Sequence, residues 1–364
     1  MASNTTSNRV IRLDALRALS IVLVVFSHGG SKVIPGGLGV LIFFVISGYV
    51  ITNSFVKEFD KTKKFSISKF YARRILKIFP PLIIIVLIPS LIMRSLLDIK
   101  LQFLLAQSMF FYNWTIIKNG SGGVLPGSEV VWSLSIEEQY YLGVAVCWCI
   151  IQIVRKKTAL KYLALLYFII YLYSTLAKFY ISYSNEEARD ATNNLSRIYF
   201  GTDCRISSIV VGGLLAIWLH RDSSFRIVAK YNMELRKNVT FYFSIFLFIF
   251  TLVVRESHFR DTLRFSIQEI AAVILCYVSV RMKFPSYIDK LALSKLVQAI
   301  GKSSYSTYLV HLTFMLGLGA FFEIDISTSN YILKAIIIVF TFCIGYIAHC
   351  ILDQPFEKLR NRLH

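Results

Sequence analysis

The chain has 364 residues, of which 55% are hydrophobic and only 17% are charged, and its mean hydropathy is +0.60. This composition excludes an ordinary soluble domain and is typical of a polytopic membrane protein. The net charge of +19 would indicate nucleic-acid binding in a soluble protein, but in a membrane protein basic residues first report topology. The six cysteines have neither a disulfide-framework spacing nor a metal-ligand spacing, so no metal site is expected.

Apolar runs of about twenty residues recur along the whole chain and predict an all-α integral membrane bundle of about ten transmembrane helices. The predicted spans are 13–30, 38–56, 75–93, 136–154, 160–180, 205–220, 239–255, 265–282, 303–322 and 331–352. The apolar stretch 101–114 is short for a crossing and fits an interfacial or re-entrant segment. The expected organisation is a tail over 1–12, a membrane domain over 13–355 and a second tail over 356–364.

The basic residues favour one orientation of this bundle. If the N-terminus is cytoplasmic, most of the lysines and arginines fall in inner segments, and the outer segment 185–190 is acidic. The positive-inside rule therefore predicts that the N-terminus and the C-terminus both face the cytoplasm. Most of the net positive charge is then a consequence of topology.

The first predicted span carries two polar residues, Arg17 and His28, on an otherwise apolar face. They are eleven positions apart, which on an α-helix returns them to nearly the same face with roughly 16 Å of rise between them. A satisfied buried pair is one interpretation. The other is that they mark two distant points of one cavity.

The second and third spans carry small residues and cations. Ser47 and Gly48 are expected to allow close contact between helices. Arg73, Arg74 and Lys77 precede Pro80–Pro81, and Arg74 and Lys77 share a helix face. A positive-inside cluster would explain these cations, but cations aimed at a proline break would also suit a phosphate-bearing ligand.

The fourth span opens with Trp132, Ser133, Glu137 and Glu138. Carboxylates entering a bilayer are functional candidates, although an interfacial position in water would also accommodate them. The spacing allows a local hydrogen bond between Ser133 and Glu137. It does not decide which carboxylate acts.

The later spans carry two further polar groups. Asp203 and Arg205 are too close in sequence to share a helix face, so they are expected to rim a cavity rather than to pair with each other. Tyr308 and His311 are one helical turn apart and form a polar stripe, for which a satisfied interhelical histidine is the favoured interpretation. His349, in the last span, is interpreted as structural.

Together these motifs resemble acyltransferase family 3, the integral-membrane O-acyltransferases that modify O-antigens, other glycans and some small molecules. The resemblance covers nearly the whole chain, and its motifs are specific in this order. They are Arg17 with His28, Phe44-Val-Ile-Ser-Gly48, Arg74 with Lys77 before Pro80, Trp132-Ser-Leu-Ser-Ile-Glu-Glu-Gln139, Asp203-Cys-Arg205, Ser304-Tyr305-Ser-Thr-Tyr308-Leu-Val-His311 and Gln354-Pro355. Because the chain ends soon after the tenth predicted span, it resembles the stand-alone form without a C-terminal hydrolase-like domain.

The resemblance implies transfer of an acyl group, most simply acetyl from acetyl-CoA, to a hydroxyl of a cell-surface or lipid-linked glycan at a bacterial inner membrane. It implies that His28 is the essential histidine and Arg17 its partner. As a hypothesis from the residues themselves, Glu137 or Glu138 orients the imidazole or binds the sugar. Donor binding would fall to Arg17, Arg73, Arg74 and Lys77, although Lys77 stands where the family's Arg-x-x-Arg motif has arginine and lacks the planar fork. Substrate-binding candidates are Trp132, Ser133, Asp203, Arg205, Tyr308 and His311.

Two alternatives stay open at this point. The acceptor could be a small molecule or a lipid rather than a polysaccharide. In a different class, intramembrane Arg, His and Glu also line the routes of secondary transporters. Against a transporter, no matching pair of broken segments appears in the two halves of the chain.

Overall fold

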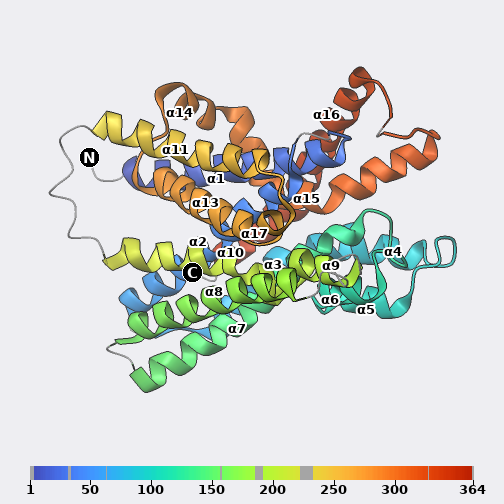
Figure 1. Ribbon diagram of the computed structural model, residues 1–364. Helices are drawn as coiled ribbons and strands as arrows, with labels where there is room; N and C mark the ends of the chain where they lie inside the picture. Colours follow the sequence, from blue (N-terminus) through green and yellow to red (C-terminus); the bar gives the residue numbers. More distant parts are fainter. Residues whose placement is uncertain are drawn as a thin grey trace. The chain divides into compact units, whose positions relative to one another are not determined.

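A computed structural model describes residues 4–31, 34–62, 64–155, 158–184, 192–221, 233–326 and 328–362. Within these ranges the chain is helical and contains no strand, which confirms the predicted all-α class (Figure 1). The acidic segment 185–190 lies outside the described residues. The orientation of the helices in the membrane stays a prediction.

The helices of the first half are α1 (Asn4–His28), α2 (Gly36–Thr62), α3 (Ile67–Leu82), η1 (Ile83–Leu87), α4 (Ile88–Ile92), α5 (Leu101–Ser108), α6 (Tyr112–Asn119), η2 (Ser128–Val130), α7 (Val131–Arg155) and α8 (Ala159–Tyr183). Those of the second half are α9 (Thr192–Phe200), α10 (Thr202–Arg221), α11 (Met233–Val253), α12 (Ser257–Asp261), α13 (Leu263–Arg281), α14 (Ser286–Ala292), α15 (Lys295–Phe321), α16 (Tyr331–Ala348), η5 (His349–Asp353) and α17 (Gln354–Asn361).

Each predicted span coincides with a long helix or a continuous run of helices. Within the described residues, seven helical segments are long and apolar enough to cross a membrane, so the predicted number of ten crossings is not confirmed. The helices α1, α7 and α15 are 25, 25 and 27 residues long but fall outside the seven. These three helices carry polar candidate site residues, and their mean hydropathy is lower because of such polar side chains.

The apolar stretch 101–114 does not form one crossing. It contains the eight-residue helix α5 and the start of the eight-residue helix α6, with Phe110 between them at a φ of 57°. A helix of eight residues rises only about 12 Å, far less than a bilayer core. The sequence-based expectation of a short, non-spanning segment is therefore consistent with the fold.

The helix break that Pro80–Pro81 would permit does not occur. Both prolines lie inside α3, and the helix continues directly into the π-helical segment η1 and then into α4. Proline lacks the N–H that closes an α-helical turn, but the helix continues past both prolines, and a wider, π-helical turn follows them at Ile83–Leu87.

The chain forms two compact units. Unit 1 contains residues Met1–Leu16, Leu41–Phe65 and Ile136–Ser294, and unit 2 contains Arg17–Val40, Ser66–Ser135 and Lys295–His364. In unit 1, α8 packs on α10 and α11 packs on α13. In unit 2, α15 packs on α16, and α17 packs on α3.

Glycines allow a close contact between two helices of unit 1. A Cβ atom on Gly48 of α2 would lie 1.8 Å from the carbonyl oxygen of Ile209 in α10, and one on Gly212 would lie 2.0 Å from that of Val45. No side chain fits at either point. The packing role predicted for Gly48 is thus confirmed.

Candidate functional site

A pair of histidines lies in unit 2. Nε2 of His311, on α15, is 3.1 Å from Nδ1 of His28 at the end of α1, and the two ring centroids are 5.1 Å apart. His311 is completely buried, and its Nδ1 lies 2.7 Å from the carbonyl oxygen of Tyr308. His311 is therefore a satisfied interhelical histidine, as predicted, but its partner is the candidate catalytic residue His28.

His28 differs from His311 in its exposure. Its side chain is exposed, so a substrate can reach the ring, whereas His311 is enclosed. Arg17 and His28 lie on the continuous helix α1, as the sequence predicted, and both belong to unit 2. The rise of roughly 16 Å between them leaves His28 free to pair with another helix.

Tyr308 ties the start of α7 to α15, one turn before His311. Its hydroxyl lies 2.7 Å from Oγ of Ser133 and donates to the carbonyl of Val130 at 3.1 Å. Trp132 is buried beside Ser133. The Ser133 hydroxyl thus contacts Tyr308. The local hydrogen bond to Glu137 that the spacing allowed is not formed.

Gly127 lets the preceding loop approach α15 closely. Its φ is 88°, and a Cβ atom there would lie 2.2 Å from the backbone nitrogen of Thr313, two residues beyond His311. The next turn holds Glu129, whose Oε2 is buried without a hydrogen-bond partner among the described residues. Burial raises the pKa of the Glu129 carboxyl, although backbone hydrogen bonds oppose the shift.

The candidate donor-binding cations also belong to unit 2. Arg17 lies on α1, and Arg73, Arg74 and Lys77 lie on α3, all of them half-buried. A further cation, Arg360 of α17, lies within electrostatic range of Arg74 and Arg17 and donates to Oε1 of Glu357 at 3.2 Å. Sequence reasoning missed Arg360 because nothing along the chain indicates that α17 folds back onto α3.

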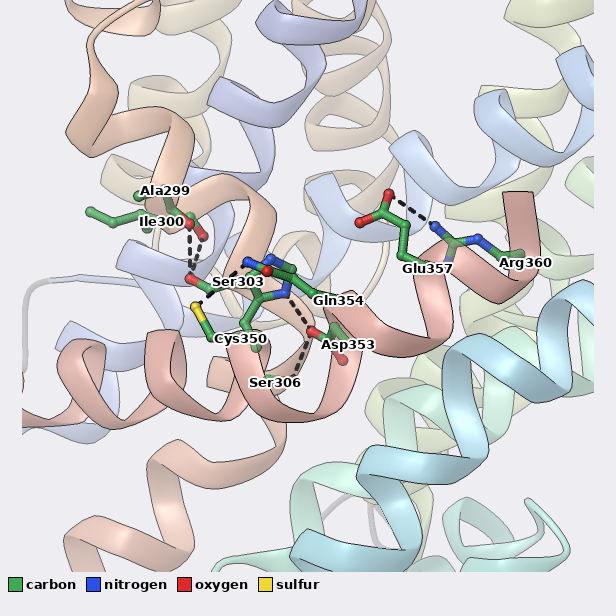
Figure 2. Close-up of polar contacts among 10 residues, drawn as sticks. Ala299, Ile300, Ser303, Ser306, Cys350, Asp353, Gln354, Glu357 and Arg360 are labelled. Atoms are coloured by element: carbon green, nitrogen blue, oxygen red, sulfur yellow. Dashed lines mark hydrogen bonds and ion pairs between the residues drawn. The ribbon is translucent and has the colours of Figure 1, made fainter. Parts of the chain in front are cut away.

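A second buried polar cluster lies on α15 closer to its N-terminal end than His311. Ser306 donates to Oδ2 of Asp353 at 2.8 Å (Figure 2). The same carboxylate oxygen lies 2.7 Å from Nδ1 of His349. Both His349 and Asp353 belong to the π-helical segment η5. His349 is nearly buried and satisfied by Asp353, which agrees with its structural interpretation.

Glu137 and Glu138 belong to unit 1. Ser47 donates to Oε1 of Glu137 at 3.0 Å, and the Tyr141 hydroxyl donates to Oε2 at 2.8 Å. Both oxygens of Glu137 are therefore held by hydroxyl groups, which fixes the orientation of its carboxylate. Glu138 is half-buried on the same helix.

Asp203 and Arg205 do not pair with each other, as the spacing predicted. Asp203 accepts hydrogen bonds from Arg197 at 2.6 and 2.9 Å. Arg205 is buried rather than at a cavity rim, with its guanidinium carbon 4.7 Å from the ring centroid of Phe265 and 5.5 Å from that of Tyr199. Its three guanidinium nitrogens have no hydrogen-bond partner among the described residues.

Next to Arg205, unit 1 holds a buried ion pair that sequence reasoning missed. Nζ of Lys178 lies 3.7 Å from Oε1 of Glu269, which also accepts from Ser207 at 2.6 Å and Ser208 at 2.8 Å. Glu269 also lines an otherwise apolar cavity of about 540 Å³ between α8, α10, α11 and α13. In the described part of the chain, no three His, Cys, Asp or Glu side chains are arranged to hold a metal ion.

The fold and the site define a multi-pass helical membrane protein with a histidine pair and clustered cations in one unit. A family model described as an acyltransferase domain matches residues 10–350. The chain belongs to this acyltransferase family, as the motifs predicted.

Curated relatives support the same assignment. The O-acetyltransferase OatA of Staphylococcus aureus (strain NCTC 8325 / PS 47) is 28% identical over 361 residues, as is the OatA of strain COL. The protein SACOL0978 of strain COL is 26% identical over 363 residues. In each case the match covers 95% of this chain and 57% of the relative, so the chain spans little more than half the length of these relatives. No solved structure matches the chain.

Proposed function

We propose that this protein transfers an acetyl group from cytoplasmic acetyl-CoA to a hydroxyl of a cell-surface or lipid-linked glycan, such as an O-antigen, at a bacterial inner membrane. Family membership supports the acyl transfer, and the names of the OatA relatives support acetyl as the group and oxygen as its destination. The observation that carries the proposal is an accessible histidine, His28, in the same unit as a group of cations.

The cations fit the donor. Coenzyme A carries a diphosphate and a further phosphate, and arginine binds phosphate through paired, charge-assisted hydrogen bonds. Arg17, Arg73, Arg74, Lys77 and Arg360 would share these phosphates. Electrostatic coupling of Arg360 to Arg74 and Arg17 means that like charges gather here, an arrangement that a polyanion would stabilise.

His28 is proposed as the general base. Its imidazole accepts the proton of the acceptor hydroxyl while the hydroxyl oxygen attacks the thioester carbonyl. The carbon–sulfur bond then breaks, and the coenzyme A thiolate takes up the proton that His28 holds. The products are an acetyl ester and free coenzyme A.

The remaining candidates are proposed to serve the acceptor. In unit 1 these are Glu137 and Glu138, as carboxylates that assist the hydroxyl, together with Asp203 and Arg205. In unit 2 they are Trp132, Ser133 and Tyr308. The rigid hydroxyl contacts of Glu137 support this role for it in particular, because an oriented carboxylate can bind a sugar hydroxyl.

The test uses the purified full chain in detergent with acetyl-labelled acetyl-CoA and a lipid-linked or polymeric glycan. We expect label to appear as a glycan ester and His28→Ala to abolish it, while the control His220→Ala, a variant of a half-exposed histidine in unit 1, retains it. Normal transfer by His28→Ala would contradict the role of His28. Uptake of unmodified sugar by vesicles containing the protein, with no consumption of acetyl-CoA, would favour a transporter instead.

A further inference from the structure

The proton positions of the histidine pair follow from the acceptors around it. A backbone carbonyl can only accept a hydrogen bond, so Nδ1 of His311, 2.7 Å from the Tyr308 oxygen, carries a hydrogen. His311 is completely buried, and its polar contacts among the described residues are a carbonyl and another imidazole rather than a carboxylate, so its doubly protonated form is disfavoured. A neutral imidazole has one N–H, and Nε2 of His311 therefore presents a lone pair.

The neutral His311 ring also determines which nitrogen of His28 carries the hydrogen. Its Nδ1 lies 3.1 Å from that lone pair, so the hydrogen between the two rings belongs to Nδ1 of His28. The carbonyl of Val24, one helical turn before His28, is a second acceptor for this ring. The hydrogen on Nδ1 leaves Nε2 of His28 with its lone pair, on a side chain that is exposed.

We propose that His311 is a positioning residue that fixes the tautomer of His28, so that Nε2 of His28 faces the acceptor hydroxyl as the base. This inference rests on the proposed function and deepens it. When Nε2 takes the hydroxyl proton, the ring becomes a cation, and its Nδ1–H bond to His311 becomes charge-assisted and stronger. His311 thus does, with a neutral ring, what the carboxylate does for histidine in hydrolase triads.

Tyr308 completes the chain of contacts. Its carbonyl sets the His311 ring, and its hydroxyl is held by Ser133 and by the carbonyl of Val130. The segment of α15 that carries His311 is therefore tied to the start of α7. A chain of this kind keeps the orientation of His28 fixed before the substrate arrives.

The first test reads the tautomer without any substrate. Nitrogen NMR of the full chain in detergent, with ¹⁵N-labelled histidine and His28→Gln for assignment, should give an unprotonated Nε2 and a protonated Nδ1 for His28. In His311→Leu, which keeps a buried side chain but has no acceptor, the fixed tautomer should be lost. A protonated Nε2 in the neutral wild-type ring would overturn the proposal, whatever the protein proves to catalyse.

The second test separates positioning from folding. In His311→Leu, kcat should fall by about 10²–10⁴-fold, the usual contribution of a positioned base, while KM for acetyl-CoA stays unchanged. In His311→Gln, whose side-chain oxygen can accept from His28, part of kcat should return. Equal losses in both variants together with a lower thermal midpoint would assign His311 a purely structural role and overturn the proposal.

Discussion

Arg12 donates two hydrogen bonds to Asp289, with Nε 2.6 Å from Oδ1 and Nη2 2.9 Å from Oδ2. Both side chains are largely buried, at 5% and 15% exposed. The pair joins α1 to the short helix α14 within unit 1. Such a fork-to-carboxylate contact is the strongest geometry that an ion pair adopts in proteins.

We predict that Asp289→Asn lowers the free energy of unfolding by about 1.5–3 kcal/mol, the usual contribution of a hydrogen bond to a charged group. Burial raises the pKa of Asp289, but the hydrogen bond and charge of Arg12 outweigh it, and the net pKa is lowered. Because the folded-state pKa lies below the unfolded value near 4, this stability is complete above about pH 4 and is lost as the pH falls further.

The measurement is the thermal midpoint of the detergent-solubilised protein between pH 3 and pH 8. The control is Glu357→Gln, which removes one partner of an ion pair whose carboxylate is 50% exposed and should change the midpoint little. Equal midpoints for Asp289→Asn and the wild type at pH 7 would contradict the prediction.

A methyl group should not be tolerated at the contact of α2 with α10. We predict that Gly48→Ala destabilises the protein by at least the roughly 1–3 kcal/mol typical of overpacking, because the obstacle is the carbonyl of Ile209 and not a mobile side chain. Gly143→Ala is the matched control, since nothing lies within 4 Å of its added Cβ. That control should keep or slightly raise the thermal midpoint, because alanine favours helix. Similar midpoints for the two variants would show that the helices separate more easily than this packing implies.

If cations of α3 bind the donor, replacing one of them should change the KM for acetyl-CoA selectively. Arg74→Ala should raise KM for acetyl-CoA about tenfold to a hundredfold, as expected for the loss of a charged hydrogen bond, and Arg360→Ala should act in the same direction. Lys69→Ala removes an exposed cation from the first turn of the same helix and should leave KM unchanged. If the Lys69 variant matches the Arg74 variant, the effect is one of overall charge and not of a phosphate site.

The buried carboxyl of Glu129 should lower the stability of the folded protein to an extent that depends on pH. Its folded-state pKa is raised by burial, so the folded protein loses stability as the pH rises from the unfolded value of about 4.3 through the folded value. We predict that Glu129→Gln raises the thermal midpoint at pH 8 and that this gain disappears at pH 4. The exposed Glu323, replaced in the same way, should show no gain at either pH. A loss of stability in Glu129→Gln at pH 8 would indicate that the ionised carboxylate is needed in the folded protein.

The helices could be predicted from the sequence because a long apolar run has few alternatives to forming a helix. The run 265–282 became α13, Leu263–Arg281, and the run 160–180 became α8, Ala159–Tyr183. The exceptions have local causes. Pro80–Pro81 permitted a break, but the helix continues through both prolines and into a π-helical turn.

The contacts of the site could not be predicted in the same way. Helical spacing placed Arg17 and His28 on one face, and it gave Tyr308 and His311 a shared stripe. It could not indicate that His28 and His311 meet, because they are 283 residues apart and the sequence does not state which helices pack together. For the same reason the helical spacing could only allow a hydrogen bond from Ser133 to Glu137, its neighbour along the helix, whereas the structure pairs Ser133 with Tyr308.

The π-helical turn Ile83–Leu87 also affects how related sequences align. In this turn the N–H of Ile88 bonds to the carbonyl of Ile83, five positions back, which amounts to one residue inserted into an α-helix. One residue corresponds to a rotation of about 100°, so Ile88 and the residues after it are out of phase with Arg74 on any single helical wheel. A homologue with a one-residue gap between positions 83 and 87 would have a regular helix here, and the side chains of its α4 would face the same way as in this chain.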